Sequence, residues 1–188
     1  MSTKLLRRAL CGLVAIVAPL GLPVNAAPPV VKTVPWVANN PLVPHSTYSG
    51  KTVTLKGTCD RAGANIQFSW DFGDGSAPVT GTVSDAYVVQ ATHAYTAPDN
   101  TLFTARLTIQ DTSTGETGSR TYLVEVMPKT LDVEANIAID EGLWYLHKAQ
   151  TRYASGDIEM GHWNTGKYGS YANRNNSSLH AANVNALL

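Results

Sequence analysis

Residues 70–75, Trp70-Asp71-Phe72-Gly73-Asp74-Gly75, decide the fold class of this chain. Apolar residues occupy every second position from Ile66 to Phe72. This period of two is typical of a β-strand with one buried face. The strand runs directly into Gly-Asp-Gly, which is a tight-turn signal. A second short stretch, His93-Ala94-Tyr95, follows further along the chain.

The same alternation recurs elsewhere in the chain. It is present at residues 52–57, 103–109 and 122–126. Turn-rich segments separate these runs, and residues 111–115 suit a hairpin. Short alternating strands of this kind predict a mainly β protein, with a β-sandwich over residues 43–128.

The aromatic-Asp-Phe-Gly-Asp-Gly motif and the later His-x-Tyr together resemble the PKD domain, an immunoglobulin-like β-sandwich of extracellular and cell-surface proteins. The resemblance implies that Trp70 is a core residue between the sheets. It implies that Asp71 and Asp74 orient the turn by accepting hydrogen bonds from backbone amides, and that Tyr95 is a tyrosine corner. Residues 76–92 are longer than the usual connection, and residues 85–89 are a candidate extra edge strand.

Asp71, Asp74 and His93 are also candidate metal ligands, because carboxylates near a Gly-rich turn can hold Ca²⁺. The stretch lacks the alternating oxygen ligands and terminal Glu of an EF-hand loop. A catalytic carboxylate pair needs a desolvated cleft, which a hairpin tip does not offer. The motif therefore predicts a structural turn, with His93 packed near the corner. We predict no catalytic residue, metal or cofactor.

The N-terminus has the pattern of a secretory signal peptide over residues 1–26. A basic start at residues 4–8 precedes an apolar run at residues 10–22 and small residues at 24–26. We expect cleavage after Ala26 and a secreted or cell-envelope protein. The alternative is an uncleaved amphipathic anchor. No other apolar run is long enough to span a membrane.

Removal of this signal changes the charge. The signal carries three of the 14 Lys and Arg residues and no Asp or Glu, which leaves 11 against 14 and a formal charge of −3. No basic patch remains that would follow a phosphate backbone, so nucleic acid is not an expected partner. Cys59 becomes the single cysteine, which excludes an internal disulfide. It is either a buried structural thiol or a group that pairs between chains or mispairs.

The segments on either side of the sandwich differ from it in pattern. Prolines are frequent in residues 27–42, which predicts an extended linker that leads into a first edge strand. After Pro128 the chain has a helical spacing, which predicts a helix over residues 132–150 with an acidic first turn. The residues at this spacing are Ala135, Ile139, Leu143, Leu146 and Gln150. A loop over residues 157–176 and a second helix over residues 178–188 are predicted to follow.

The segment from Gln150 to Gly161-His162-Trp163 resembles the glutamine–tryptophan repeat of α/α-toroid proteins such as terpenoid cyclases. In that family the Gln caps a helix end and the Trp stacks over it. The gap here is longer than that repeat allows, and a single repeat cannot bury its own apolar face. Residues 129–188 are therefore either an ordinary helical tail with exposed aromatics or an incomplete toroid repeat. We expect the tail to be less stable than the sandwich and protease-sensitive after Lys129.

The functional prediction is a noncatalytic extracellular or cell-envelope protein. Its PKD-like sandwich contacts protein or polysaccharide, or acts as a spacer. Aromatic side chains supply stacking area, so the predicted contact residues are Tyr48, Tyr87, Trp163, Tyr168 and Tyr171. The alternative is the accessory front end of an enzyme whose α/α-toroid catalytic domain begins within residues 131–188, with further repeats encoded downstream of Leu188.

Overall fold

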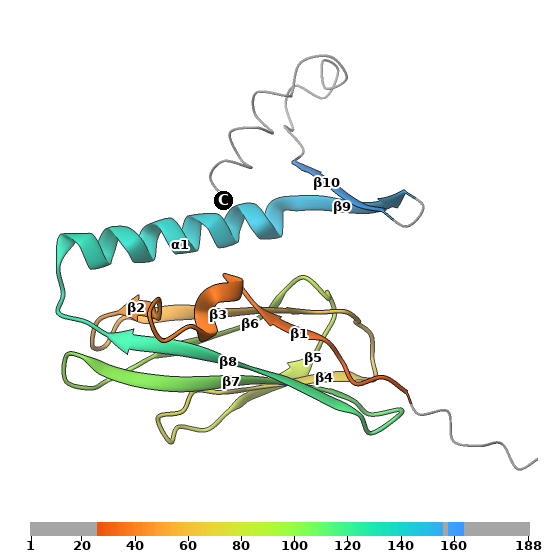
Figure 1. Ribbon diagram of the computed structural model, residues 1–188, viewed down its shortest axis with the longest axis horizontal. Coiled ribbons are helices and arrows are strands. Elements are labelled where there is room, and N and C mark those ends of the chain that lie inside the picture. Colours follow the sequence, from red (N-terminus) through yellow and green to blue (C-terminus); the bar gives the residue numbers. More distant parts are fainter. Residues whose placement is uncertain (1–25, 156–157, 164–188) are drawn as a thin grey trace, which may run out of the picture.

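The computed structural model describes residues 26–155 and 158–163. Two β-sheets face each other and form a sandwich, and one long helix lies across one side of it (Figure 1). The predicted signal peptide over residues 1–26 falls outside the described residues except for Ala26, and the predicted second helix at residues 178–188 falls outside them entirely.

The larger sheet has five strands in the order β2-β8-β7-β4-β5. The pairs within it are antiparallel, except that β2 runs parallel to β8. The strands are β2 (His45–Thr47), β4 (Ile66–Asp71), β5 (Val79–Thr82), β7 (Thr101–Asp111) and β8 (Thr117–Val126).

The smaller sheet has three antiparallel strands in the order β1-β3-β6. They are β1 (Val31–Thr33), β3 (Thr52–Cys59) and β6 (Val89–Ala94). Trp70 lies between the two sheets with no exposed surface, and its indole N–H donates to the carbonyl of Val89 at 3.3 Å. The alternation read from the sequence thus gives the buried face of β4, and the predicted β-sandwich is confirmed.

The predicted linker over residues 27–42 is not a free linker. β1 pairs with β3, with Val31 opposite Cys59, and Ala38 in the 3-10 helix η1 (Trp36–Asn39) is only 2% exposed. Pro29 and Pro35 flank β1 without interrupting it, so the strand can complete an edge of the smaller sheet.

The extra edge strand is β5, and the candidate at residues 85–89 is wrong. Residues 85–88 turn instead, with the Asp85 carboxylate accepting from the Tyr87 amide at 2.9 Å. An Asp side chain that bonds its own backbone two residues on favours a turn over a strand. Val89 then begins β6.

Helix α1 (Leu131–Ala149) begins where the sequence predicts a helix. Thr130 caps it by accepting from the Val133 amide at 3.3 Å, and its first turn is acidic. The sandwich covers Val133, Ile137 and Trp144, whereas Ile139, one of the residues whose spacing predicts the helix, is 60% exposed. The spacing of apolar residues fits two faces of this helix and does not say which one the sandwich covers.

A β-hairpin follows α1, in a region where the sequence predicts the end of the helix and the start of a loop. It pairs β9 (Gln150–Ser155) with β10 (Ile158–Trp163). Its first and last residues, Gln150 and Trp163, lie opposite each other, so the chain returns to the C-terminal end of α1 (Figure 1).

Candidate functional site: a helix fixed to the sandwich

The Gly-Asp-Gly turn after β4 is held by its own carboxylates. Asp71 accepts from the Gly73 amide at 2.9 Å, and Asp74 accepts from the Ser76 amide at 3.0 Å. Gly73 has φ of 73°, and a Cβ placed on it would lie 2.3 Å from the carbonyl oxygen of Thr104. Only glycine fits this position.

His93 and Tyr95 lock this turn to the core. His93 donates from Nε2 to Asp74 Oδ2 at 2.6 Å and stacks on Phe72 with ring centroids 4.0 Å apart. Tyr95, which has no exposed surface, donates to the Phe72 carbonyl at 3.1 Å. Partial burial raises the pKa of Asp74, but hydrogen bonds from Ser76 and His93 outweigh it and lower that pKa to about 2. The turn is therefore a structural corner, as the sequence predicts.

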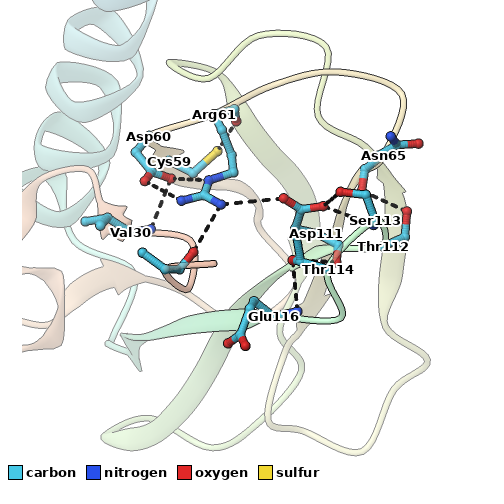
Figure 2. Close-up of polar contacts among 11 residues, drawn as sticks. Val30, Cys59, Asp60, Arg61, Asn65, Asp111, Thr112, Ser113, Thr114 and Glu116 are labelled. Carbon is cyan, nitrogen blue, oxygen red and sulfur yellow. Dashed lines mark hydrogen bonds and ion pairs between the residues drawn. The ribbon is translucent and has the colours of Figure 1, made fainter. Parts of the chain in front are cut away.

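A second polar cluster closes one end of the sandwich (Figure 2). Arg61 binds the Asp60 carboxylate with two hydrogen bonds of 2.9 and 3.0 Å. It also donates to the carbonyl of Ala27 at 3.2 Å and lies 3.5 Å from Asp111 Oδ2. This guanidinium thus joins the segment before β1, the β3–β4 loop and the β7–β8 turn.

Cys59 lies beside this cluster and is buried, as predicted for a structural thiol. Its Sγ donates to the Arg61 carbonyl at 2.8 Å, and burial raises the pKa of the thiol. A raised pKa keeps the thiol protonated and unreactive. Among the described residues, no group of His, Cys, Asp and Glu is arranged to hold a metal ion.

A third group of polar contacts lies between β3 and α1. Lys56 is 1% exposed, and its ammonium forms an ion pair with Asp140 Oδ2 and also donates to the Asp140 carbonyl at 3.2 Å. Glu141 accepts from both the amide and the hydroxyl of Thr54 at 3.2 Å. A buried ammonium needs such partners because its desolvation is costly.

His45 on β2 lies beside the same ion pair. Its Nδ1 is 3.5 Å from Asp140 Oδ2, and its ring lies 5.6 Å from that of Tyr122. Within the described part of the chain, Nε2 of His45 has no hydrogen-bond partner. A proton there would be unsolvated, and burial lowers the pKa of His45 despite the opposing charge of Asp140.

The C-terminal half of α1 is held by aromatic and polar contacts. The Trp144 indole donates to Gln90 Oε1 at 2.6 Å, and the ring stacks on His147 with centroids 4.8 Å apart. His147 donates from Nε2 to the carbonyl of Tyr87 at 2.9 Å. Arg152 donates to the His147 carbonyl at 2.7 Å and lies over the Tyr87 ring at 4.4 Å. Burial, assisted by the Arg152 charge, lowers the pKa of His147 to about 4.

The hairpin closes the end of α1. The Trp163 indole donates to the carbonyl of Leu146 at 2.7 Å, so it satisfies one of the free carbonyls of the last helical turn. A Cβ on Gly161 would lie 2.6 Å from the Gln150 side-chain amide, so this amide lies close against the backbone of Gly161.

Residues 37–126 match the family model described as PKD domain. This chain contains a PKD domain. A similar solved structure is the PKD domain of an M14-like peptidase from Thermoplasmatales archaeon SCGC AB-540-F20, at 21% sequence identity. That match covers 54% of this chain and 94% of the other chain, with a TM-score of 0.34. No curated protein matches this chain.

The PKD match agrees with the sandwich predicted over residues 43–128 and begins slightly earlier, in η1. The family suggests an extracellular or cell-surface protein. None of the helices in the described residues has both the length and the apolar character required to cross a bilayer.

The predicted contact aromatics on or near the PKD domain are engaged within the chain. Trp163 is 8% exposed and binds α1, so it is not an exposed contact residue. Tyr87 is half-buried under Arg152, and Tyr48 is half-buried with Lys129 at 5.1 Å from its ring centroid. Tyr168 and Tyr171 lie outside the described residues.

Sequence reasoning missed the residues that join the PKD domain to α1. Lys56 falls on the polar side of the alternation in β3, which predicts a solvent-exposed side chain. Asp140 and Glu141 resemble ordinary helix-surface charges. The one available signal was the spacing of Val133, Ile137 and Trp144, which defines a second apolar face with Asp140 in its middle.

Proposed function

We propose that this chain is a noncatalytic extracellular or cell-envelope protein whose PKD domain is a rigid spacer. In this role it holds the segment that begins with α1 in a fixed orientation. The observation that carries the proposal is the buried ion pair between Lys56 in the sandwich and Asp140 in α1. A flexible tether between a domain and a helix would need no such pair.

The interface has both apolar and polar parts, which favours a fixed geometry over a sliding contact. Val133 and Ile137 belong to the same hydrophobic core as the sandwich residues. Directional contacts at Lys56, Thr54 and Gln90 fix the rotation of the helix about its axis. Apolar burial supplies most of the attraction, and the polar contacts select one arrangement.

The use of Tyr87 and Trp163 inside the chain favours the spacer role over direct capture of protein or polysaccharide. Tyr87 has its ring under Arg152 and its carbonyl bound to His147. Trp163 is bound to the end of α1. Neither ring is free for a flat stacking contact with a ligand.

A second candidate function is the accessory front end of an α/α-toroid enzyme. The contact of Gly161 with the Gln150 side chain and the placement of Trp163 over the helix end favour it. These are the roles that the glutamine–tryptophan resemblance implies. In that case the PKD domain would mount the first helix of a larger helical domain.

Electron spin resonance distances test the spacer role. Spin labels are placed at Ala77→Cys, in the exposed turn before β5, and at Thr151→Cys, just after α1, in a chain with Cys11 and Cys59 replaced by Ala. The distance between them reports the orientation of the helix on the sandwich. We expect one narrow distance distribution, which Asp140→Ala broadens. Glu134→Ala is the matched control, because its ion pair with Lys129 is exposed and involves no residue of β3. A broad distribution in the parent protein would contradict the proposal.

A further inference from the structure

Helix α1 also has an apolar face on the side away from the sandwich, opposite the buried face of Val133, Ile137 and Trp144. Successive helical residues turn by about 100°, which separates this face from Val133, Ile137 and Trp144. We call it the outer face of α1. It consists of Leu131, Ala135, Ala138, Ile139, Gly142, Tyr145, Leu146 and Ala149. It contains no Asp, Glu, Lys or Arg.

The large side chains of the outer face are exposed. Leu131 is 80% exposed, Ile139 is 60% exposed and Tyr145 is 69% exposed. No strand of the sandwich lies on this side of α1 (Figure 1). A helix at a protein surface normally carries its charges on the outward side, whereas a helix that is apolar on opposite sides lies between two layers.

The middle of the outer face is shaped for close approach. Ala135, Ala138 and Gly142 bring only small side chains to it, and a Cβ on Gly142 would meet nothing within 4 Å. A glycine inside a helix costs about 1 kcal/mol relative to alanine. At Gly142 this cost is offset if another backbone packs there.

We propose that residues 178–188 of the same chain form a helix that packs on the outer face of α1. The position of the chain at the end of β10 supports this occupant. Trp163 donates to the carbonyl of Leu146, which is itself an outer-face residue, and it lies opposite Gln150. The chain therefore leaves β10 beside the C-terminal end of the outer face.

The length of the chain after β10 and the absence of charge in residues 178–188 both agree with docking of this segment on the outer face. Residues 164–177 can span up to about 46 Å, and a helix over residues 178–188 is about 16 Å long against about 28 Å for α1. Residues 178–188 contain no Lys, Arg, Asp or Glu, and the sequence predicts Leu179, Ala182 and Ala186 on one face. An uncharged helix thus meets an uncharged face.

Tethering favours this segment over a second copy of the protein. A segment that belongs to the same chain as its docking face has an effective concentration in the millimolar range when the connection is short. A separate molecule at micromolar concentration competes poorly with it. The outer face lies on the opposite side of α1 from the Lys56–Asp140 pair. Residues 178–188 could therefore fail to dock there while the proposed spacer role holds.

A disulfide test uses Ala138→Cys with Ala182→Cys, in a chain with Cys11 and Cys59 replaced by Ala. We expect a disulfide within one molecule under mild oxidation, formed about tenfold faster than in a control pair because packing raises the effective concentration. The control joins Ala182→Cys to Thr114→Cys, an exposed residue of the β7–β8 turn. Equal rates in the two pairs, or a disulfide between molecules, would overturn the proposal.

A charge in the outer face provides a second readout. Ala138→Glu should expose residues 164–188 to rapid proteolysis while the thermal melting of the sandwich stays unchanged. Ala62→Glu, in the exposed β3–β4 loop, is the matched control and should have no effect. Proteolysis of residues 164–188 that is equally fast in the parent and in Ala138→Glu would also overturn the proposal.

Discussion

Lys56 in β3 and Asp140 in α1 form an ion pair in which the lysine side chain is 1% exposed. Removal of Asp140 would take away the nearest counter-charge of this buried ammonium and leave Glu141 Oε1 at 3.7 Å from Lys56 Nζ. We expect Asp140→Ala to lower the free energy of unfolding by up to about 3–5 kcal/mol, the usual cost of breaking a buried pair from one side. Urea melts followed by tryptophan fluorescence measure this loss.

The double variant Lys56→Met with Asp140→Leu is the informative control for this pair. Replacing both charges removes the desolvation cost together with the attraction, so the double variant should be more stable than Asp140→Ala alone. Glu134→Ala breaks an exposed pair with Lys129 and should change stability by less than about 1 kcal/mol. A double variant that is no more stable than Asp140→Ala would contradict this account.

Mild acid should loosen α1 from the sandwich through His45 and His147. Burial lowers the pKa of both rings, that of His147 to about 4, whereas a histidine in the unfolded chain titrates near its ordinary pKa of 6.5. The unfolded state therefore binds more protons below that value, so stability is complete above pH 6.5 and falls as the pH drops toward 4. Asp74, with a pKa of about 2, stays charged in this range.

Urea melts at neutral pH and at about pH 5, midway between these pKa values, test this dependence. His147→Gln removes one titrating group but keeps an N–H donor for the Tyr87 carbonyl. The loss of stability on acidification should be smaller in this variant than in the parent. If the two proteins lose the same stability, titration of His147 makes no contribution.

Trp70 is the main packing residue of the sandwich. It has no exposed surface, and it contacts Tyr122 edge-on with centroids 5.8 Å apart. Trp70→Ala should cost about 3–5 kcal/mol, as for other large core truncations. Asp71→Ala, which removes one exposed hydrogen bond to the turn, should cost about 1 kcal/mol. Similar melting curves for Trp70→Ala and the parent would contradict the buried position of this side chain.

The sequence predicted those parts of the fold that local patterns determine. The alternation through Trp70 predicts a strand with one buried face, and the glycine at Gly73 predicts a tight turn. Both predictions depend only on neighbouring residues. The burial of Lys56 has no local signature, because a lysine on the polar side of a strand normally faces water. Its charged end is partnered by Asp140 of α1, a contact between elements far apart in the sequence. The choice between the two apolar faces of α1 likewise depends on which side the sandwich lies.

Residues 1–26 predict export of this protein. Their basic, apolar and small-residue order predicts cleavage after Ala26 and a mature chain that begins at Ala27. N-terminal sequencing of the protein recovered outside the cytoplasm checks both points together. A chain that retains Met1 in the cytoplasm would contradict the predicted location.

Proteolysis distinguishes an independent tail from a helix that belongs to the sandwich. The sequence alone predicts cleavage after Lys129, at the junction with the sandwich. The structure changes this expectation, because Val133 and Ile137 share the hydrophobic core of the PKD domain. Local opening of α1 must break those contacts as well as the ion pair of Lys56. Trypsin should therefore cleave the parent protein after Lys129 and after Lys148 slowly.

Asp140→Ala should accelerate both of these cuts. It weakens the attachment of α1, so the helix opens more often while the sandwich stays folded. Arg106 in β7 is the internal control, because cleavage there requires the strand to leave the sheet. Mass spectrometry of timed digests gives the rates of cleavage after Lys129, Lys148 and Arg106. Rapid cleavage after Lys129 in the parent, with Arg106 protected, would show that α1 is a separate unit and that the PKD domain does not hold it.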